Sequence, residues 1–222
     1  MKKNMEDEQK RDKPISKTVI SRLPRYYRFL GMIEAEGVSK TSSSDLARRM
    51  GLTASQIRQD LNCFGGFGQQ GYGYNVSELK KDIGDILGIN NNYSCVLFGA
   101  GNIGMAISQH LNFSALGFKL TAIFDINKNL IGKKIYGVEI HDVSEYESLK
   151  EKLNPKAAIL CTPDEVGFET TKLLYDSGVR YFWNFSHYNI NKDFEDAIVE
   201  NVHLNDSLMT LCYAITNDDK ID

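Results

Sequence analysis

The stretch from Ser94 to Gly104 constrains the fold more than any other part of the chain, because an apolar run leads directly into the pattern Gly-x-Gly-x-x-Gly. Gly99 and Gly101 permit a tight turn and a close approach of the backbone to a pyrophosphate, and Gly104 lets the next helix pack closely on its strand. The first turn of that helix offers free N–H groups and a partial positive charge to an anion. The predicted phosphate-binding residues are Gly99, Ala100, Gly101, Asn102, Ile103 and Gly104.

A second apolar run, Leu120–Phe124, ends in Asp125, which lies 21 residues after Gly104. In dinucleotide-binding βαβ units an acid at this distance accepts hydrogen bonds from a ribose 2′-OH. A plain glycine-rich turn with an acidic helix cap explains the glycines but not the position of the acid. Asp125 favours NAD(H) over NADP(H), because a 2′-phosphate would meet a like charge, but Lys128 is near enough to leave NADP(H) open.

Strands and helices continue to alternate after Asp125, which predicts a doubly wound α/β sheet. Ligands bind such sheets at the carboxyl ends of the strands, so we expect Thr162 and Pro163 beside a nicotinamide and Asn184 near the cofactor. The later helices are expected at 143–153 and 164–177, and the later strands at 157–162, 179–185 and 199–204.

Charge is divided unevenly along the 222 residues. Residues 1–88 hold 15 Lys and Arg against 11 Asp and Glu, a net charge of +4, whereas residues 89–222 hold 11 against 18, a net charge of −7. A basic first part suggests that this part meets a polyanion, although a solvated face would explain four charges equally well. The length allows one large domain or two small ones.

Cysteine usage and hydropathy indicate a cytoplasmic protein without a membrane partner. No C-x-x-C pair and no histidine at metal-ligand spacing occur, which predicts buried or partly buried thiols in a reducing compartment and no metal site. No stretch reaches 18 apolar residues, and Met1–Lys13 lacks the apolar region of a signal peptide. The four thiols are Cys63, Cys95, Cys161 and Cys212.

The first part of the chain is predicted to begin with a disordered tail, residues 1–14, followed by a helix. Pro24 implies either that the helix begins there or that a short helix precedes it. Arginines at 22, 25 and 28 form a stripe that is either solvated or, in the case of Arg22, in contact with DNA. The predicted apolar face of this helix is Ile20, Leu23, Tyr27, Leu30 and Ile33.

The pattern of residues 42–50 predicts a short amphipathic helix that ends in a turn at Gly51. Thr53 is the predicted cap of a second helix. Ala47 and Ile57 have the spacing by which a small residue and an aliphatic residue pack the two helices of a helix-turn-helix, and an ordinary αα-hairpin is the alternative. The second helix would enter a major groove, where arginine pairs with guanine and glutamine with adenine. Its predicted DNA-binding residues are Ser55, Gln56, Arg58 and Gln59.

The glycine-rich segment from Phe64 to Tyr74 carries interleaved aromatic residues. This composition suits a β-hairpin that lies on a phosphate backbone or in a minor groove, as the wing of a winged helix does, and a flexible linker is the alternative. Tyr72 and Tyr74 are the predicted wing contacts. A helix from Val76 to Leu87, capped by Ser77, then leads to the glycine-rich unit.

An apolar stripe at helical spacing occupies the C-terminal end of the chain. A terminal helix with such a face must bury it on its own sheet or on a second subunit. The predicted domains are therefore 15–88, 89–204 and a C-terminal helix at 205–222. The stripe consists of Leu204, Leu208, Leu211 and Ile215.

From about Ile15 onward the chain resembles the Rex redox-sensing transcriptional repressors. The resemblance implies an N-terminal winged-helix domain, an NAD-binding Rossmann domain, and a homodimer whose C-terminal helix is exchanged between subunits. It further implies repression from a palindromic operator, with NAD⁺ permitting binding and NADH releasing the DNA. The matching stretches are 21–28, 57–61, 64–68, 71–74, 99–104, 124–125, 184–185 and 200–202.

Several positions depart from the family. Gln69 and Gln70 stand where the wing usually carries Lys or Arg, which removes a source of phosphate attraction. The family's switch is thought to use an arginine, a tyrosine and an aspartate, whose positions hold Arg28, His110 and His203. The histidines are either drifted residues or form a neutral or pH-sensitive contact.

Two alternatives follow from these residues. The departures leave open a Rex-like paralogue with altered DNA specificity or no redox switch. A small dehydrogenase with an added domain is the alternative from another class, but no acid–base pair is positioned to move a proton, so we expect no enzyme.

Overall fold

The structure is a computed structural model that describes residues 15–65, 67 and 73–217. The chain forms two compact units that divide between Asn90 and Asn91. Tyr72, Gln69 and Gln70 of the predicted wing lie outside the described residues, as do residues 1–14.

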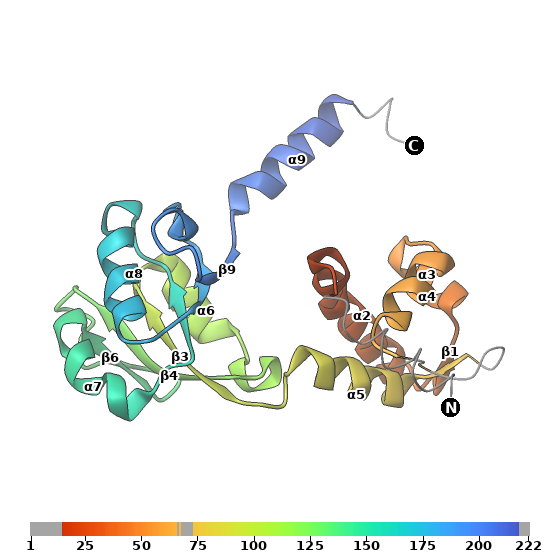
Figure 1. Ribbon diagram of the computed structural model, residues 1–222, viewed down its shortest axis with the longest axis horizontal. Coiled ribbons are helices and arrows are strands. Elements are labelled where there is room, and N and C mark those ends of the chain that lie inside the picture. Colours follow the sequence, from red (N-terminus) through yellow and green to blue (C-terminus); the bar gives the residue numbers. More distant parts are fainter. Residues whose placement is uncertain (1–14, 66, 68–72, 218–222) are drawn as a thin grey trace, which may run out of the picture. The chain divides into compact units, whose positions relative to one another are not determined.

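The first unit is a small helical domain with one short antiparallel pair of strands (Figure 1). Strand β1 pairs with β2, so that the chain segments before α3 and after α4 are held together. Helices α2 and α5 pack against each other, and so do α3 and α4. The elements are α2 (Lys17–Ala35), β1 (Lys40–Thr41), α3 (Ser43–Met50), α4 (Ala54–Asn62), β2 (Tyr74–Asn75) and α5 (Val76–Leu87).

Helix α2 differs from the sequence prediction in two respects. It runs without a break through Pro24, so neither predicted boundary at this proline is correct. The proline is exposed, and because it has no N–H, the carbonyl of Ile20 lacks its intrahelical donor within a helix that otherwise continues. The buried face holds Tyr26 in place of Tyr27, while Ile20 is 45% exposed.

Side-chain caps fix where the first unit's helices begin. Ser42 accepts a hydrogen bond from the N–H of Asp45, and Thr53 accepts one from the N–H of Gln56, as expected for their helices. Helix α5 is capped by Asn75 rather than by the predicted Ser77, because the Asn75 side chain reaches the first turn of the helix.

The second unit is a seven-stranded sheet in the order β5-β6-β4-β3-β7-β8-β9, parallel except for β5 (Figure 1). The chain winds outward in one direction from β3 through β4 to β6 and in the other from β7 to β9, which is the doubly wound Rossmann arrangement. The crossover point lies between β3 and β7. The strands are β3 (Tyr93–Phe98), β4 (Phe118–Asp125), β5 (Lys134–Ile135), β6 (Val138–Asp142), β7 (Ala157–Leu160), β8 (Tyr181–Asn184) and β9 (Ile198–Asn201).

Apolar residues fill both faces of the sheet. One cluster centres on Phe98, Phe124 and Tyr146, whose rings stack or meet edge to face. A second cluster on other strand residues includes Leu97 and Ile107. The helices are α6 (Asn102–His110), α7 (Tyr146–Leu153), α8 (Gly167–Asp176) and α9 (Leu204–Thr216), with 3₁₀ turns at 113–116, 143–145, 164–166 and 190–192.

Helix α9 contributes nothing to either core, since none of its described residues is buried. Its predicted apolar stripe is exposed, with Leu208 61% and Ile215 70% accessible. Of the two expected locations for this face, the unit's own sheet is therefore excluded. Among the described helices, none is long and apolar enough to cross a membrane.

Candidate dinucleotide site and nucleic-acid interface

Three strand ends meet at the crossover point of the sheet. Phe98 pairs with Phe124 on one side and with Leu160 on the other, so the next residues along each strand lie at the same edge. The N–H of Gly99 donates to the carbonyl of Phe124 at 2.8 Å, and the N–H of Cys161 donates to that of Phe98 at 2.8 Å. The glycine-rich turn therefore lies between the ends of β4 and β7.

The three glycines of the turn have different surroundings. A Cβ on Gly104 would lie 1.9 Å from the carbonyl oxygen of Gly99, and a Cβ on Gly99 would lie 2.6 Å from that of Cys161. Gly99 also has a φ of +95°, which side chains disfavour. A Cβ on Gly101, by contrast, would meet no protein atom within 4 Å. Gly99 and Gly104 are thus needed by the fold, whereas the space at Gly101 is open to a ligand.

Asp125 joins the end of β4 to the glycine-rich turn. Its carboxylate accepts hydrogen bonds from the N–H of Ala100 at 2.6 Å and from that of Asn127 at 2.7 Å. A carboxylate has about four acceptor positions, so two remain for ribose hydroxyls. Asp125 therefore shapes the loop, a role that its spacing in the sequence did not indicate. Lys128 is exposed three residues after Asp125.

Thr162 follows β7 and carries a buried hydroxyl without a hydrogen-bond partner among the described residues. An unpaired buried hydroxyl costs about 1–3 kcal/mol, which a ligand oxygen or nitrogen at this position would recover. Pro163 is exposed beside it. The residues around the crossover therefore fit a dinucleotide, with an open cradle at Gly101 and an orphaned hydroxyl at Thr162.

The side chain of Asn184 has a different environment from the predicted one. It is completely buried at the end of β8, and its Nδ2 donates to the carbonyl of Tyr188 at 3.0 Å and to Oδ1 of Asn201 at 2.9 Å. Its Oδ1 accepts from the N–H and the hydroxyl of Ser186. These bonds use the whole side-chain amide, so Asn184 organises the loop after β8, and its contact with a cofactor stays a prediction.

In the first unit, the predicted recognition helix α4 presents polar side chains to solvent. Ser55, Arg58 and Gln59 are exposed and Gln56 is half-buried. The buried face holds Ile57, Leu61 and one charged residue that sequence analysis passed over, Asp60.

Arg22, a predicted DNA-binding residue, forms a two-pronged ion pair with Asp60. Its Nε and Nη2 lie 2.6 and 2.7 Å from the two carboxylate oxygens. Tyr26 donates its hydroxyl hydrogen bond to the same carboxylate. The guanidinium is therefore engaged inside the unit, on the side of α2 that packs on α4.

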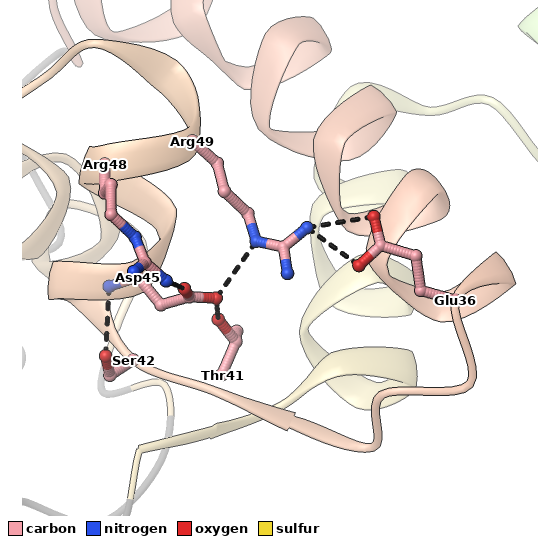
Figure 2. A network of polar contacts seen from close by, with 6 residues as sticks. All are labelled: Glu36, Thr41, Ser42, Asp45, Arg48 and Arg49. Atoms are coloured by element: carbon pink, nitrogen blue, oxygen red, sulfur yellow. Dashed lines mark hydrogen bonds and ion pairs between the residues drawn. The ribbon is translucent and has the colours of Figure 1, made fainter.

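A second polar network surrounds Asp45 at the start of α3 (Figure 2). Its carboxylate accepts from the Thr41 hydroxyl at 3.1 Å, from Nε of Arg49 at 3.2 Å and from Arg48. Arg49 also pairs with Glu36 at 2.8 Å, beyond the end of α2. The hydrogen bond from Arg48 holds the pKa of Asp45 below its ordinary value. This network connects β1, α3 and the end of α2.

Tyr74 of the predicted wing is held against its own unit, whereas two of the predicted switch residues, Arg28 and His110, are exposed. The Tyr74 hydroxyl lies 3.1 Å from that of Ser43, so Tyr74 packs against α3. Arg28 is exposed in the first unit, and His110 is exposed at the end of α6. His203 precedes α9 and stacks on His187, with ring centroids 5.8 Å apart and planes within 5°.

The thiols differ from the prediction in part. Cys95 and Cys161 are covered, and burial raises the pKa of each to about 12. Cys63, the residue after α4, and Cys212, on α9, are exposed, which differs from the prediction. Among the described residues no three His, Cys, Asp or Glu side chains form a group that could hold a metal ion.

Family profiles match both units of the chain. Residues 14–62 match the profile described as "Putative DNA-binding protein N-terminus", and residues 90–188 match that of a CoA binding domain. A redox-sensing transcriptional repressor Rex from Clostridium botulinum is 49% identical over 199 residues, which cover 90% of this chain and 94% of the relative. A Rex from Clostridium perfringens is 45% identical over 207 residues, which cover 93% and 97%.

Solved structures show the same similarity. The crystal structure of RSP in complex with β-NAD⁺ and operator DNA has 44% sequence identity and a TM-score of 0.84, and covers 94% of this chain and 95% of that chain. RSP in complex with β-NADH has 42% identity and a TM-score of 0.85, and covers 94% and 97%. RSP is described as a Rex-family repressor.

Proposed function

The chain belongs to the family of Rex redox-sensing transcriptional repressors, and we propose that it binds operator DNA as a dimer and senses the NADH/NAD⁺ balance. The observation that carries the proposal is the crossover edge of the sheet, where β3 leads to the open backbone at Gly101 and the neighbouring strand β7 leads to the buried hydroxyl of Thr162, which has no partner among the described residues. The unpaired hydroxyl of Thr162 costs stability, and the fold does not need the glycine at position 101. Both features suit a bound dinucleotide.

The cofactor is held by backbone groups and two side chains. The N–H groups at the start of α6, from Gly101 to Gly104, bind the pyrophosphate. Asp125 accepts from the adenosine ribose, and its negative charge excludes a 2′-phosphate. Thr162 and Pro163 adjoin the nicotinamide, and Lys128 lies at the adenosine end. When bound, the nicotinamide would supply its redox state as the signal, and the thiol of Cys161, the residue before Thr162, stays protonated because burial raises its pKa to about 12.

DNA binding rests on the exposed face of α4. Arg58 and Gln59 read base edges in a major groove, with Ser55 and Gln56 near the start of the helix. The wing, with Tyr72, adds contacts to the phosphate backbone. The cofactor acts on this interface by stabilising one relative placement of the two units, and NADH favours the placement that releases DNA. Arg28, His110 and His203 are the proposed switch residues.

The dimer buries the exposed face of α9. Leu204, Leu208 and Leu211 are each more than half exposed. Burying this apolar face against a second copy of the chain makes the free energy of association more favourable. The sheet of the second unit also has an apolar groove of about 380 Å³, lined among others by Phe113, Trp183 and Ile198. In the proposed dimer, the α9 stripe of one copy packs on the second unit of its partner, and this groove is the apolar surface that the second unit offers to it.

The proposal is tested by fluorescence anisotropy of the operator duplex crystallised with RSP, titrated with protein alone, with NAD⁺ and with NADH. NADH should release the duplex and NAD⁺ should not. Arg58→Ala should weaken operator binding about tenfold at unchanged thermal stability, because Arg58 is exposed. Tight binding that ignores both cofactors would instead identify a repressor without a redox switch, and no operator binding in any state would contradict the proposal.

A further inference from the structure

We propose that Asp60 is a positioning residue: through Arg22 and Tyr26 it fixes the rotation of α4 against α2 and thereby determines whether α4 can read operator bases. The inference rests on the proposed function, because it assigns a residue to the DNA-reading step. It also removes Arg22 from the set of DNA-contacting residues and makes it a support of the recognition helix.

The contacts on Asp60 are directional. Arg22 donates from Nε and Nη2 to different carboxylate oxygens at 2.6 and 2.7 Å, so the planar guanidinium fixes the plane of the carboxylate as well as its distance. Tyr26, one helical turn further along α2, donates to Oδ2 of the same group. Two side chains of one helix thus hold one side chain of the other from adjacent positions.

Burial makes these contacts obligatory. The side chain of Asp60 is only 4% exposed, and burial by itself would raise its pKa. The hydrogen bonds from Arg22 and Tyr26 outweigh that effect, and the pKa of Asp60 lies below its ordinary value. A buried carboxylate deprived of these donors would be left without compensation, so the unit keeps α4 in the orientation that preserves them.

The orientation of α4 matters because Asp60 lies about 200° around the helix from Arg58, on the opposite face. A helix with side chains has a radius of about 5–6 Å, so a rotation of about 10° moves a side-chain tip by about 1 Å. Hydrogen bonds to base edges lose most of their strength when displaced that far.

The other buried residues of α4, Ile57 and Leu61, make apolar contacts, which are non-directional and resist such a rotation weakly. The ion pair is therefore the contact that sets the rotation.

The test compares the operator duplex of the RSP complex with a random duplex of the same length, by anisotropy at several salt concentrations. Asp60→Asn should weaken operator binding at least tenfold, because its Nδ2 faces a donor of Arg22, and should leave binding to the random duplex within twofold. Arg22→Lys should act in the same direction, because an ammonium cannot make two parallel hydrogen bonds. The salt slope should stay unchanged in both variants, since no phosphate contact is lost.

Asp82→Asn is the matched control, since Asp82 is an exposed acid on α5. Removing either acid makes the unit more basic and strengthens binding to any DNA slightly. Asp82→Asn therefore measures the effect of losing one negative charge on DNA binding. A loss of operator binding in Asp60→Asn has the opposite sign and cannot come from that charge effect. Should Asp60→Asn fail to fold, Tyr26→Phe removes one hydrogen bond and keeps the ion pair, and a smaller loss in the operator-to-random ratio is then expected.

An unchanged operator-to-random ratio in folded Asp60→Asn, or in Tyr26→Phe when it replaces that variant, would overturn the inference. A fall of about 0.9 in the salt slope of Arg22→Ala on both duplexes would also overturn it, because Arg22 would then contact a phosphate.

Wild-type protein that prefers no operator would refute the proposed function instead. Hydrogen exchange then tests separately whether Asp60 holds α4 in place: faster exchange in α4 but not in α5 of Asp60→Asn supports this step of the inference, and equal exchange overturns it.

Discussion

Replacement of Gly101 by alanine should weaken NADH binding without changing the stability of the ligand-free fold. A Cβ at this position meets no protein atom within 4 Å, and the φ of −71° is ordinary for alanine. Alanine has fewer conformations than glycine in the unfolded chain, which stabilises the folded variant by about 0.4–1 kcal/mol. Alanine is also a poorer helix N-cap than glycine, which costs a similar amount. We expect the unfolding free energy of the ligand-free protein to change by less than about 1 kcal/mol.

NADH binding should respond strongly to the same methyl group. In the proposed site the pyrophosphate approaches the backbone at Gly101, so an added carbon there should weaken NADH binding at least tenfold, or about 1.4 kcal/mol. With NADH at 100 times the wild-type Kd, ligand stabilisation would fall from about 2.7 to about 1.4 kcal/mol. Isothermal titration calorimetry gives the affinity, and thermal unfolding with and without NADH gives the stabilisation.

Gly104→Ala provides the contrast. Its Cβ would lie 1.9 Å from the backbone oxygen of Gly99, which no side-chain rotation relieves. We expect a loss of about 3 kcal/mol or more in the ligand-free protein. The reasoning is refuted if Gly101→Ala binds NADH with wild-type affinity, or if Gly104→Ala is as stable as Gly101→Ala.

Three further outcomes are expected. Asp125→Ala should weaken NADH binding and bring NADPH binding closer to it, since the like charge that a 2′-phosphate meets is removed; an unchanged preference in competitive titrations would speak against that role. Leu208→Asp should dissociate the dimer in analytical ultracentrifugation, while Thr210→Asp, a charge added on the same helix outside the apolar stripe, should not; a dimeric Leu208→Asp would show that the stripe is not the interface. Because the pKa of Asp60 is depressed in the folded state, its stabilisation is present above the unfolded pKa of about 3.9 and is lost as the pH falls through the folded value. The stability difference between wild type and Asp60→Asn should therefore shrink below about pH 4 in denaturant titrations, and a constant difference would contradict this linkage.

Local patterns in the sequence determined most of the architecture. The glycines at 99, 101 and 104 with Asp125 specify a strand, a turn, a helix and a second strand by spacing alone, because each is a requirement on neighbouring backbone. Periodicity likewise specified helix α5 at its observed ends, Val76 and Leu87, and the exposed stripe of α9.

Tertiary structure decided how polar side chains are used. Arg22 and Asp60 are 38 residues apart and meet only when α2 packs on α4, so no local pattern distinguishes this ion pair from a DNA-contacting arginine. The side-chain amide of Asn184 likewise forms all its hydrogen bonds within the fold, one of them to Asn201 on the next strand.

The three glycines also look alike in the sequence. Only the carbonyl groups around Gly99 and Gly104, and the open space at Gly101, show which of them the fold requires and which is left for a ligand. Spacing along the chain fixes the backbone, whereas the pairing of side chains depends on distances that arise when the elements pack.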